Sequence, residues 1–325
     1  MPRGFVLGLV RAIAVILGVI TLTFLLLHLA PGDPVQRLLG PSATAGQADA
    51  LRHSLGLDRP LPQQFASWVG RALTGDFGVS VATGRSVRAS LGQAWPATAA
   101  LVLLSLTLTY LFGFVLGAFQ ANTRSRATDA LVTVGTVTLN AMPGYWLGLV
   151  LVMVFTYRLR VLPAFGASGL DSEFLSPAGR IADYLRHLAL PLATLTLIGI
   201  GGAARFTRAA MREVRDAPYL IVARAKGVGR VGTVVRHQFR NALVPIVTLL
   251  GLSLPALFSG TVFVEAVFAW PGVGQLMVQG VQARDYPVVM AAATVSAVLV
   301  VAGNALADIL VGVVDPRARR LHDAR

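Results

Sequence analysis

The chain contains 325 residues, of which 55% are hydrophobic and only 13% are charged. Soluble domains usually carry about 25% charged residues, so this composition disfavours a soluble enzyme and favours a membrane protein. The absence of cysteine excludes disulfide frameworks, thiolate zinc sites and cysteine nucleophiles. The net charge of +13 is compatible with nucleic acid or with a membrane surface, and the positions of the basic residues decide between them.

Six apolar stretches are long enough to cross a bilayer as helices. A hydrocarbon core of about 30 Å requires roughly 20 apolar helical residues, and lipid offers no hydrogen-bond partner to an open backbone. The stretches cover residues 10–32, 97–121, 130–157, 187–204, 241–264 and 286–309. We therefore expect an all-α membrane protein with six transmembrane helices in a single transmembrane domain over residues 1–325. The first stretch is expected to be a retained helix, because no small-residue cleavage site follows it.

The basic residues between these stretches predict the orientation of the chain. With six spans, 17 Arg and Lys residues flank one side of the membrane and 11 flank the other. The side with 17 includes both termini and the segment 205–240, which we expect to be cytoplasmic. The segment 33–96 then lies outside the cytoplasm and could form a small cap. Basic residues placed beside apolar spans indicate lipid headgroups as their partner, and nucleic acid is not expected.

The sequence contains no motif for catalysis or for a cofactor in a suitable setting. A P-loop needs Gly-Lys-Ser/Thr, and the only lysine, Lys226, instead precedes Gly227. HExxH and GxSxG are missing, and the five histidines have no metal-ligand spacing. Residues 227–232 match GxGxxG, but they lie in a short basic loop rather than after a strand. We therefore expect no cofactor or metal on this chain and no enzymatic activity by itself.

Proline and glycine interrupt several of the predicted spans. The interruptions are Pro143 and Gly144 in the third span, Pro191 in the fourth and Pro255 in the fifth. Proline removes a helical hydrogen bond, which membrane helices tolerate where neighbours or a water-lined cavity satisfy the freed carbonyl. Flexible joints along a translocation path and ordinary helix packing both fit this pattern. The spacing Gly113-x-x-x-Gly117 also favours a close helix contact.

Four arginines after the fourth span share one helical face. They are Arg205, Arg208, Arg212 and Arg215, at spacings of three, four and three residues. A voltage sensor also uses periodic arginines, but its charges lie inside the membrane, whereas these follow the apolar run. We therefore expect this face to act as an anchor that reaches anionic headgroups.

The next residues predict a short helix with its own start and stop. Asp216 suits the N-cap and Pro218 suits the first turn. Arg224 and Lys226 complement the C-terminal dipole, while Gly227 can supply a left-handed stop. A helix this short is not stable alone, so it needs a surface to pack on. That surface is either another protein or the membrane itself.

Here the chain resembles the permease subunits of ATP-driven dipeptide and oligopeptide importers of the OppB/DppB type. The local resemblance consists of Tyr219-Leu-Ile-Val-Ala-Arg-Ala-Lys-Gly227, then Arg236-His237, Arg240-Asn241-Ala242 and Pro245. It continues along the whole chain in Pro31-Gly32-Asp33-Pro34, Gly75-Asp76-Phe77-Gly78-Val79-Ser80, Glu265, Phe268, Pro271-Gly272 and Asp315-Pro316-Arg317. Each piece is short, but their order together with six spans is specific.

The resemblance implies a type I ABC importer permease fold in the cytoplasmic (inner) membrane of a prokaryote. It implies a coupling helix within 205–240 and a sizeable extracytoplasmic loop after the first span. The implied partners are a homologous second permease, an extracytoplasmic solute-binding protein, and two ABC ATPase subunits that hold ATP and Mg. The implied substrate is a di- or oligopeptide, with nickel and glutathione as alternatives within the family.

The resemblance also implies roles for individual residues. The residues that would couple the chain to an ATPase are Tyr219, Ala223, Arg224, Ala225, Lys226 and Gly227. Those that would support the coupling loop are Asp216, Pro218, Arg236, His237, Arg240 and Asn241. Glu265 and Phe268 could belong to an outer gate, whereas Glu265 could also be an interfacial residue whose carboxylate reaches water. Pro143, Gly144 and Pro255 would be helix breaks along the path.

An ion-coupled secondary transporter or channel is the main alternative. Such proteins commonly bury ionisable residues within their spans, and here only His28 and Asp308 approach that category. A membrane-embedded enzyme would need a nucleophile or a metal constellation, and the sequence shows neither.

Overall fold

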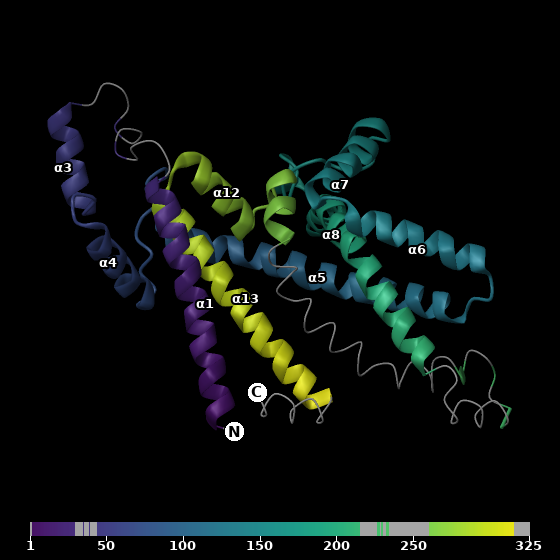
Figure 1. Ribbon diagram of the computed structural model, residues 1–325. Coiled ribbons are helices and arrows are strands. Elements are labelled where there is room, and N and C mark those ends of the chain that lie inside the picture. Colours follow the sequence, from purple (N-terminus) through teal and green to yellow (C-terminus); the bar gives the residue numbers. More distant parts are fainter. Residues whose placement is uncertain are drawn as a thin grey trace. The chain divides into compact units, whose positions relative to one another are not determined.

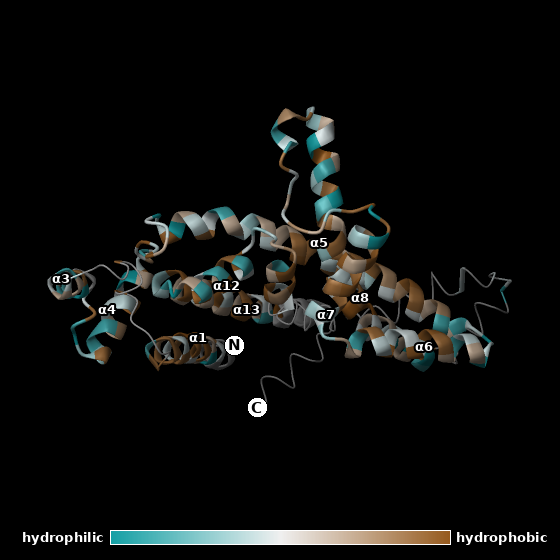
Figure 2. Cartoon of the chain, turned by 90° about the horizontal axis from the view of Figure 1, so that it is seen from above, coloured by the Kyte–Doolittle hydropathy of each residue, from teal (hydrophilic) through white to brown (hydrophobic). Residues whose placement is uncertain are grey.

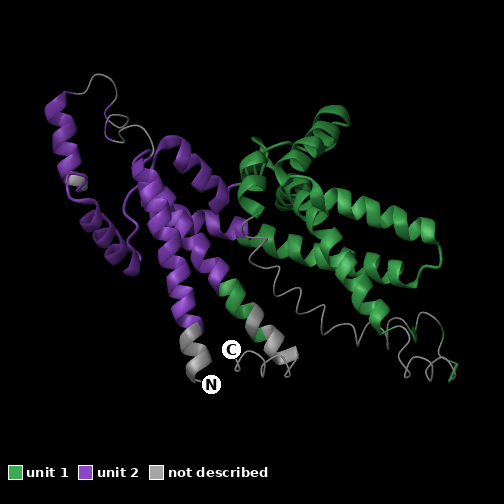
Figure 3. Cartoon of the chain, in the orientation of Figure 1, with its two compact units in different colours: residues 1, 99–270, 302–325 green, residues 2–98, 271–301 purple. Residues whose placement is uncertain are grey.

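The computed structural model describes residues 2–29, 35, 39, 44–214, 226, 227, 229, 232, 233 and 260–314 (Figure 1). Regular structure within these residues is helical, apart from one isolated antiparallel bridge between Val79 and Ser86. The chain divides into two compact units (Figure 3). Unit 1 comprises residues 1, 99–270 and 302–325, and unit 2 comprises 2–98 and 271–301. The expectation of a single transmembrane domain stays a prediction.

Four described helices are long and apolar enough to cross a membrane. They are Gly8–Leu29 within α1, Val87–Asn122 (α5), Pro177–Glu213 (α8) and Tyr286–Leu306 within α13. A fifth candidate is the bent pair Arg126–Ala141 and Gly144–Arg158, if the pair counts as one span. In Figure 2, hydrophobic residues predominate in α1, whereas α3 and α4 carry more hydrophilic ones. The predicted span 241–264 lies outside the described residues except for 260–264.

Helices α5 and α8 begin earlier than the predicted spans. α5 starts at Val87 and α8 at Pro177, whereas the apolar stretches start at residues 97 and 187. The start of α8 is fixed by a local cap, because the Ser176 side chain accepts a hydrogen bond from the Gly179 N–H and proline occupies the first turn. The apolar stretch indicates which residues could lie within the lipid, whereas the capping residues determine where the helix itself begins.

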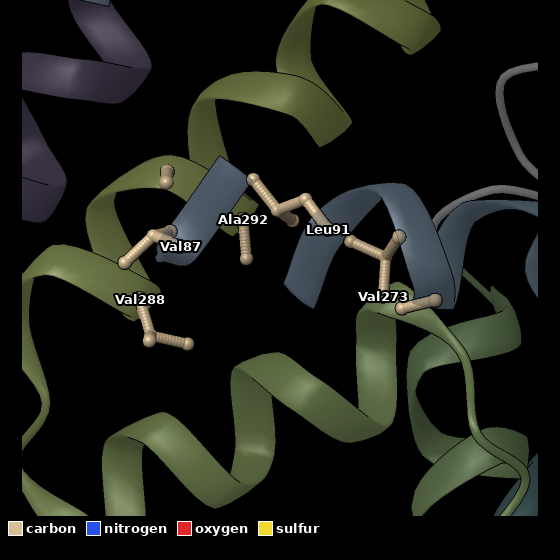
Figure 4. Packing of buried hydrophobic residues seen from close by; sticks show 7 residues of the cluster. Val87, Leu91, Val273, Val288 and Ala292 are labelled. Carbon is tan, nitrogen blue, oxygen red and sulfur yellow. The ribbon is translucent and has the colours of Figure 1, made fainter. Parts of the chain in front are cut away.

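Unit 2 has its core where α5 begins. The unit contains α1 (Pro2–Leu29), α3 (Ala45–Leu55), α4 (Leu61–Leu73), the start of α5, α12 (Val273–Ala283) and the first part of α13 (Tyr286–Val314). Val87 and Leu91 of α5 pack with Val273 of α12 and with Val288 and Ala292 of α13 (Figure 4). These side chains form one buried cluster that is shared by the three helices.

The segment expected to form an outer cap contains two helices with defined ends. α3 begins with a capping box between Thr44 and Gln47 and ends at Gly56, which has a φ of 67°. α4 packs on α1 through Phe65 and Phe24, whose ring centroids are 5.3 Å apart. α4 is therefore packed against α1, whereas the ends of α3 are set by its own local caps.

Unit 1 is built around α8. It contains most of α5, α6 (Arg126–Ala141), α7 (Gly144–Leu151), the π-helix η1 (Val152–Arg158), the 3-10 turn η2 (Ser172–Phe174), α8 and helical residues 260–267. A Cβ atom on Gly113 of α5 would lie 2.5 Å from Ala203 Cβ, and one on Gly117 would lie 2.4 Å from the Ala204 carbonyl oxygen. The predicted close contact at Gly113 and Gly117 is thus confirmed, and its partner is α8.

The other side of α8 meets α6 at similarly close range. A Cβ atom on Gly201 would lie 2.4 Å from the carbonyl oxygen of Thr136. Glycine at these positions therefore lets the α5, α6 and α8 backbones approach more closely than any larger residue would allow.

One carboxylate joins the same three helices near the end of α8. Asp129, in the first turn of α6, accepts hydrogen bonds from Arg208 and Arg212 of α8, the latter at 3.1 Å. The Gln120 amide of α5 donates to the carbonyl oxygen and the carboxylate of Asp129, both at 3.3 Å. Because the Asp129 side chain is only 18% exposed, these bonds lie in partly buried surroundings.

The arginine face after the fourth predicted span has partners within the protein that the sequence did not indicate. Arg208 and Arg212 bind Asp129, and the Arg205 guanidinium donates to the side-chain oxygen of Asn140 at 3.1 Å. All three arginines therefore fasten α8 to α6, and the expectation that this face also reaches headgroups stays a prediction. The sequence predicted the shared face correctly, but periodicity could not reveal that the facing helix supplies an acid and an amide. Arg215 lies outside the described residues.

Replacing Gly117 with valine should destabilise unit 1, because the new side chain would collide with α8. We expect the cost of overpacking to be about 1–3 kcal/mol, seen as a lower melting temperature of the purified chain in detergent. Gly135→Val is the matched control, since Gly135 is a helical glycine with no atom within 4 Å of an added Cβ. Equal melting temperatures for the two variants would contradict the close contact.

Replacing Asp129 with asparagine removes the charge that Arg208 and Arg212 share. Hydrogen bonds to charged groups contribute about 1.5–3 kcal/mol, so the melting temperature should fall clearly. Asp49→Asn provides the comparison, because Asp49 pairs with Arg52 while its side chain is 74% exposed. If Asp129→Asn changed stability no more than Asp49→Asn, the junction would not hold the three helices together.

Candidate functional site

The predicted helix break at Pro143 and Gly144 is present in unit 1. α6 ends at Ala141, α7 begins at Gly144, and the two segments are bent by 106°. Pro143 precedes α7 but offers no side-chain acceptor to it. The first N–H groups of a helix have no intrahelical acceptor, and Pro143 supplies none from its side chain. That this break lies along a translocation path stays a prediction.

A cavity of about 410 Å³ lies at this break. Its described walls come from α5, α6, α7, α8 and helical residues 260–267, and its lining residues are Thr109, Tyr110, Asn140, Gly144, Tyr145, Leu195, Ile198, Gly199, Gly202, Ala203, Phe206, Gly260 and Phe263. The described lining is mostly apolar, with several aromatic rings and few polar groups. Volume and lining both fall within the usual range for small-molecule sites.

Two polar side chains in this lining differ in how they are satisfied. The Asn140 amide donates to the Ile198 carbonyl oxygen at 3.1 Å and accepts from Arg205 at the same distance. Thr109 is 4% exposed, and its hydroxyl has no hydrogen-bond partner among the described residues. Sequence reasoning identified neither residue. The Pro143-Gly144 break was the one signal that pointed to this region.

The residues predicted for an outer gate lie in a packed part of unit 1. Phe268 is 1% exposed and lies against Gly148 of α7, where an added Cβ would be 3.0 Å from the ring. The Phe268 carbonyl oxygen accepts from the Gly166 N–H at 2.8 Å. Glu265 is fully buried, which contradicts the interpretation that its carboxylate reaches water. A gating role for these residues stays a prediction.

Most of the predicted coupling residues fall outside the described part of the chain. These are Asp216, Pro218, Tyr219, Ala223, Arg224, Ala225, Arg236, His237, Arg240 and Asn241, and the same holds for Pro255. Lys226 and Gly227 are described and form an exposed turn. Gly227 has a φ of 79°, a left-handed conformation that the predicted helix stop requires. The role of Gly227 in ending a helix stays a prediction.

In unit 2, the motif over residues 75–80 is held by a buried acid that sequence reasoning did not identify. Asp285 is 2% exposed and accepts hydrogen bonds from the Ser80 hydroxyl and, at 3.1 Å, from the Ala82 N–H. The side chain of Asp76 accepts from the Gly78 N–H at 2.9 Å. The motif over residues 75–80 is thus fixed to the start of α13, because Asp285 immediately precedes that helix.

The titratable groups of the described residues give no metal centre. Within these residues, no group of three or more His, Asp and Glu side chains is placed to hold a metal ion.

At the end of α3, the His53 and Asp58 side chains are hydrogen-bonded at 2.7 Å. This hydrogen bond lowers the pKa of the exposed Asp58 carboxyl below its ordinary value. The pair links α3 to the turn that follows it.

Comparison with known proteins covers nearly the whole chain. Residues 113–320 match the family described as binding-protein-dependent transport system inner membrane component, and residues 1–110 match the N-terminal domain of such membrane components. The oligopeptide transport system permease protein AppB of Bacillus subtilis is 36% identical over 94% of this chain and 96% of its own length. The probable D,D-dipeptide transport system permease protein DdpB of Escherichia coli is 38% identical over 96% and 95%.

The name of a third relative specifies glutathione rather than a dipeptide or an oligopeptide as the substrate. The glutathione transport system permease protein GsiC of Escherichia coli is 35% identical over 96% of both chains. Matches of this extent to two adjoining family patterns and to full-length relatives establish the family. The chain belongs to the inner-membrane components of binding-protein-dependent transport systems, which are permease subunits and not enzymes on their own.

Proposed function

We propose that the chain is the membrane-spanning permease subunit of an ATP-driven importer for di- or oligopeptides. The observation that carries the proposal is the full-length similarity to permeases whose names specify oligopeptide, dipeptide and glutathione transport. The chain has several apolar helices that could line a path and no P-loop that could bind ATP. The energy for transport therefore comes from separate subunits.

The complex that we propose has four kinds of protein component. This chain pairs with a homologous permease in the inner membrane of a prokaryote, with both termini in the cytoplasm. Two ABC ATPase subunits bind ATP and Mg on the cytoplasmic side, and a solute-binding protein delivers peptide on the other side. Lipids surround the spans. The six-span fold, with its coupling helix within 205–240, belongs to the same proposal.

Force enters the permease through residues 218–226, which dock on an ATPase in this proposal. Two described features support this role. The Asp129 junction holds the end of α8 immediately before the coupling segment, and Gly227 supplies a left-handed turn directly after it. A segment that follows an anchored helix end and stops at a defined turn can transmit a push more directly than a loose one. ATP and loaded binding protein then shift the balance between inward- and outward-open packings.

Replacing Gly227 with valine tests the proposed function and its coupling step together. A left-handed backbone costs a residue with a side chain about 1–2 kcal/mol, and a β-branched residue suffers most. In proteoliposomes containing the whole complex, we expect ATP-dependent peptide uptake to fall about 5- to 30-fold. Peptide-stimulated ATP hydrolysis should fall with it, while the complex still copurifies.

Gly229→Val is the matched control, because Gly229 is an exposed neighbour without a left-handed φ, and this variant should retain uptake. Normal uptake by Gly227→Val would contradict the coupling assignment. Wild-type uptake that needed no ATPase and followed an ion gradient would instead identify a secondary transporter.

A further inference from the structure

Residues 165–186, which we call the arm, are a segment of unit 1 in which no residue is buried. The arm comprises the loop before η2, η2 itself and the first turns of α8. Its tip runs from Leu170 to Phe174, whose exposed fractions are 101% and 88%. On the first turns of α8, Ile181 and Leu185 are 63% and 56% exposed. Several large apolar side chains exposed on one short segment mark a surface that binds another molecule.

Hydrogen bonds within the arm fix the conformation of its tip. The Asp183 carboxylate of α8 accepts from the Gly169 N–H at 2.7 Å, on one side of the tip. On the other side, the Arg180 guanidinium of α8 donates to the carbonyl oxygens of Glu173 and Leu175 at 2.7 and 3.2 Å. The tip is thus tied to the first turns of α8 although it buries no side chain. A partner that binds a preformed tip loses little conformational entropy on ordering it.

The charges of the tip favour a protein partner over a lipid one. Asp171 and Glu173 lie between the two apolar residues of the tip and are exposed, and neither carboxylate has a hydrogen-bond or ion-pair partner among the described residues. The tip could not enter the hydrocarbon of a bilayer without carrying both carboxylates with it, which is costly. An apolar hollow beside lysine or arginine side chains, on a protein in water, would accept both kinds of side chain.

Two observations select the protein that fits this surface. The arm lies between the third and fourth predicted spans, on the same predicted extracytoplasmic side as residues 33–96. The family of the chain is described as binding-protein-dependent, so a soluble binding protein belongs to the system. A homologous permease would meet the chain mainly along the apolar spans, where carboxylates are rare. The binding protein is therefore the partner that suits an acidic and apolar tip on this side.

We propose that the tip of the arm is a docking point for the solute-binding protein, which would receive Leu170 and Phe174 in an apolar hollow and pair lysine or arginine with Asp171 and Glu173. The apolar contacts supply most of the affinity, and the charges increase the rate of association. The inference rests on the proposed importer and adds to it the surface at which the binding protein is recognised.

The experiment measures ATP hydrolysis by proteoliposomes that contain the whole complex, at rising concentrations of the purified binding protein of the same system, loaded with alanyl-alanine. We expect Leu170→Ala and Phe174→Ala each to raise the concentration needed for half-maximal stimulation about tenfold, as truncation of a central apolar contact does. Leu73→Ala is the matched control, because Leu73 ends α4 in unit 2 and is 84% exposed. This variant should leave the half-maximal concentration unchanged.

A double variant tests the charged half of the surface. Asp171→Asn combined with Glu173→Gln should raise the half-maximal concentration of binding protein about fivefold at low ionic strength. At high ionic strength the same variant should differ little from wild type, because salt screens exposed charges. Equal effects at both ionic strengths, or no effect at either, would contradict the role given to the carboxylates.

Crosslinking identifies the partner directly. The chain contains no cysteine, so Phe174→Cys places one unique site for a photoreactive maleimide at the tip. Illumination of the complex with its binding protein should give a product that contains the binding protein, whereas Leu73→Cys should give none. A product with the second permease or with lipid in place of the binding protein would overturn the proposal.

The remaining outcomes separate the docking surface from the proposed function. If wild type transported peptide but Leu170→Ala and Phe174→Ala needed no more binding protein than wild type, the importer would stand and the docking surface would be wrong. An equally large rise in Leu73→Ala would also contradict the docking surface. If wild type took up no di- or oligopeptide while Phe174→Cys still crosslinked to the binding protein, the docking surface would stand and the peptide importer would be wrong.

Discussion

The close approach of α8 to both α5 and α6 is the constraint on which unit 1 depends. Added Cβ atoms on Gly113, Gly117 and Gly201 would lie within 2.5 Å of atoms in the facing helices, so there is no room for a side chain at these three positions. Apolar burial cannot by itself hold helices together in lipid, because lipid tails are as apolar as leucine. Close packing and interhelical hydrogen bonds have to supply that attraction, and unit 1 contains both.

The interhelical hydrogen bonds lie near the end of α8, just before the segment that follows this helix in the chain. Asp129 gathers Arg208 and Arg212 from α8 and Gln120 from α5. From this junction the chain continues directly into the segment proposed to dock on an ATPase. Toward the other end of the α6–α8 contact lies the cavity at the Pro143-Gly144 break. The same helix, α8, thus contributes residues both to the Asp129 junction and to the lining of the cavity.

Sequence reasoning predicted those features that depend on local chemistry. The apolar stretches located α1, α5, α8 and α13, and the Gly113-x-x-x-Gly117 spacing indicated a close contact. Proline was less decisive, because Pro143 coincides with a break whereas Pro191 lies within the continuous helix α8. Pro143 is followed by a glycine, which lowers helix propensity further, whereas Pro191 is flanked by leucines.

Features that depend on distant partners could not be predicted in this way. Thr109, Asn140 and Asp285 gain their significance from residues far away in the chain, and no periodicity marks them. The arginine face was predicted as a face, but its partners on α6 were not, because sequence spacing gives a direction and not the identity of the neighbour. The burial of Glu265 was missed for the same reason, since a charge at the end of a span gives no sign of what packs around it.

The central claim is that a separate ATPase binds residues 218–226 and drives the conformational change of the permease. The chain contains no cysteine, so Ala223→Cys would place one unique crosslinking site in that segment. In an intact complex that transports peptide, we expect this cysteine to crosslink to an ATPase subunit, with a yield that changes when ATP is added. Ala50→Cys in α3, which is exposed and lies on the other predicted side, should give no such product. A transporting complex in which Ala223→Cys never reached an ATPase subunit would contradict the account.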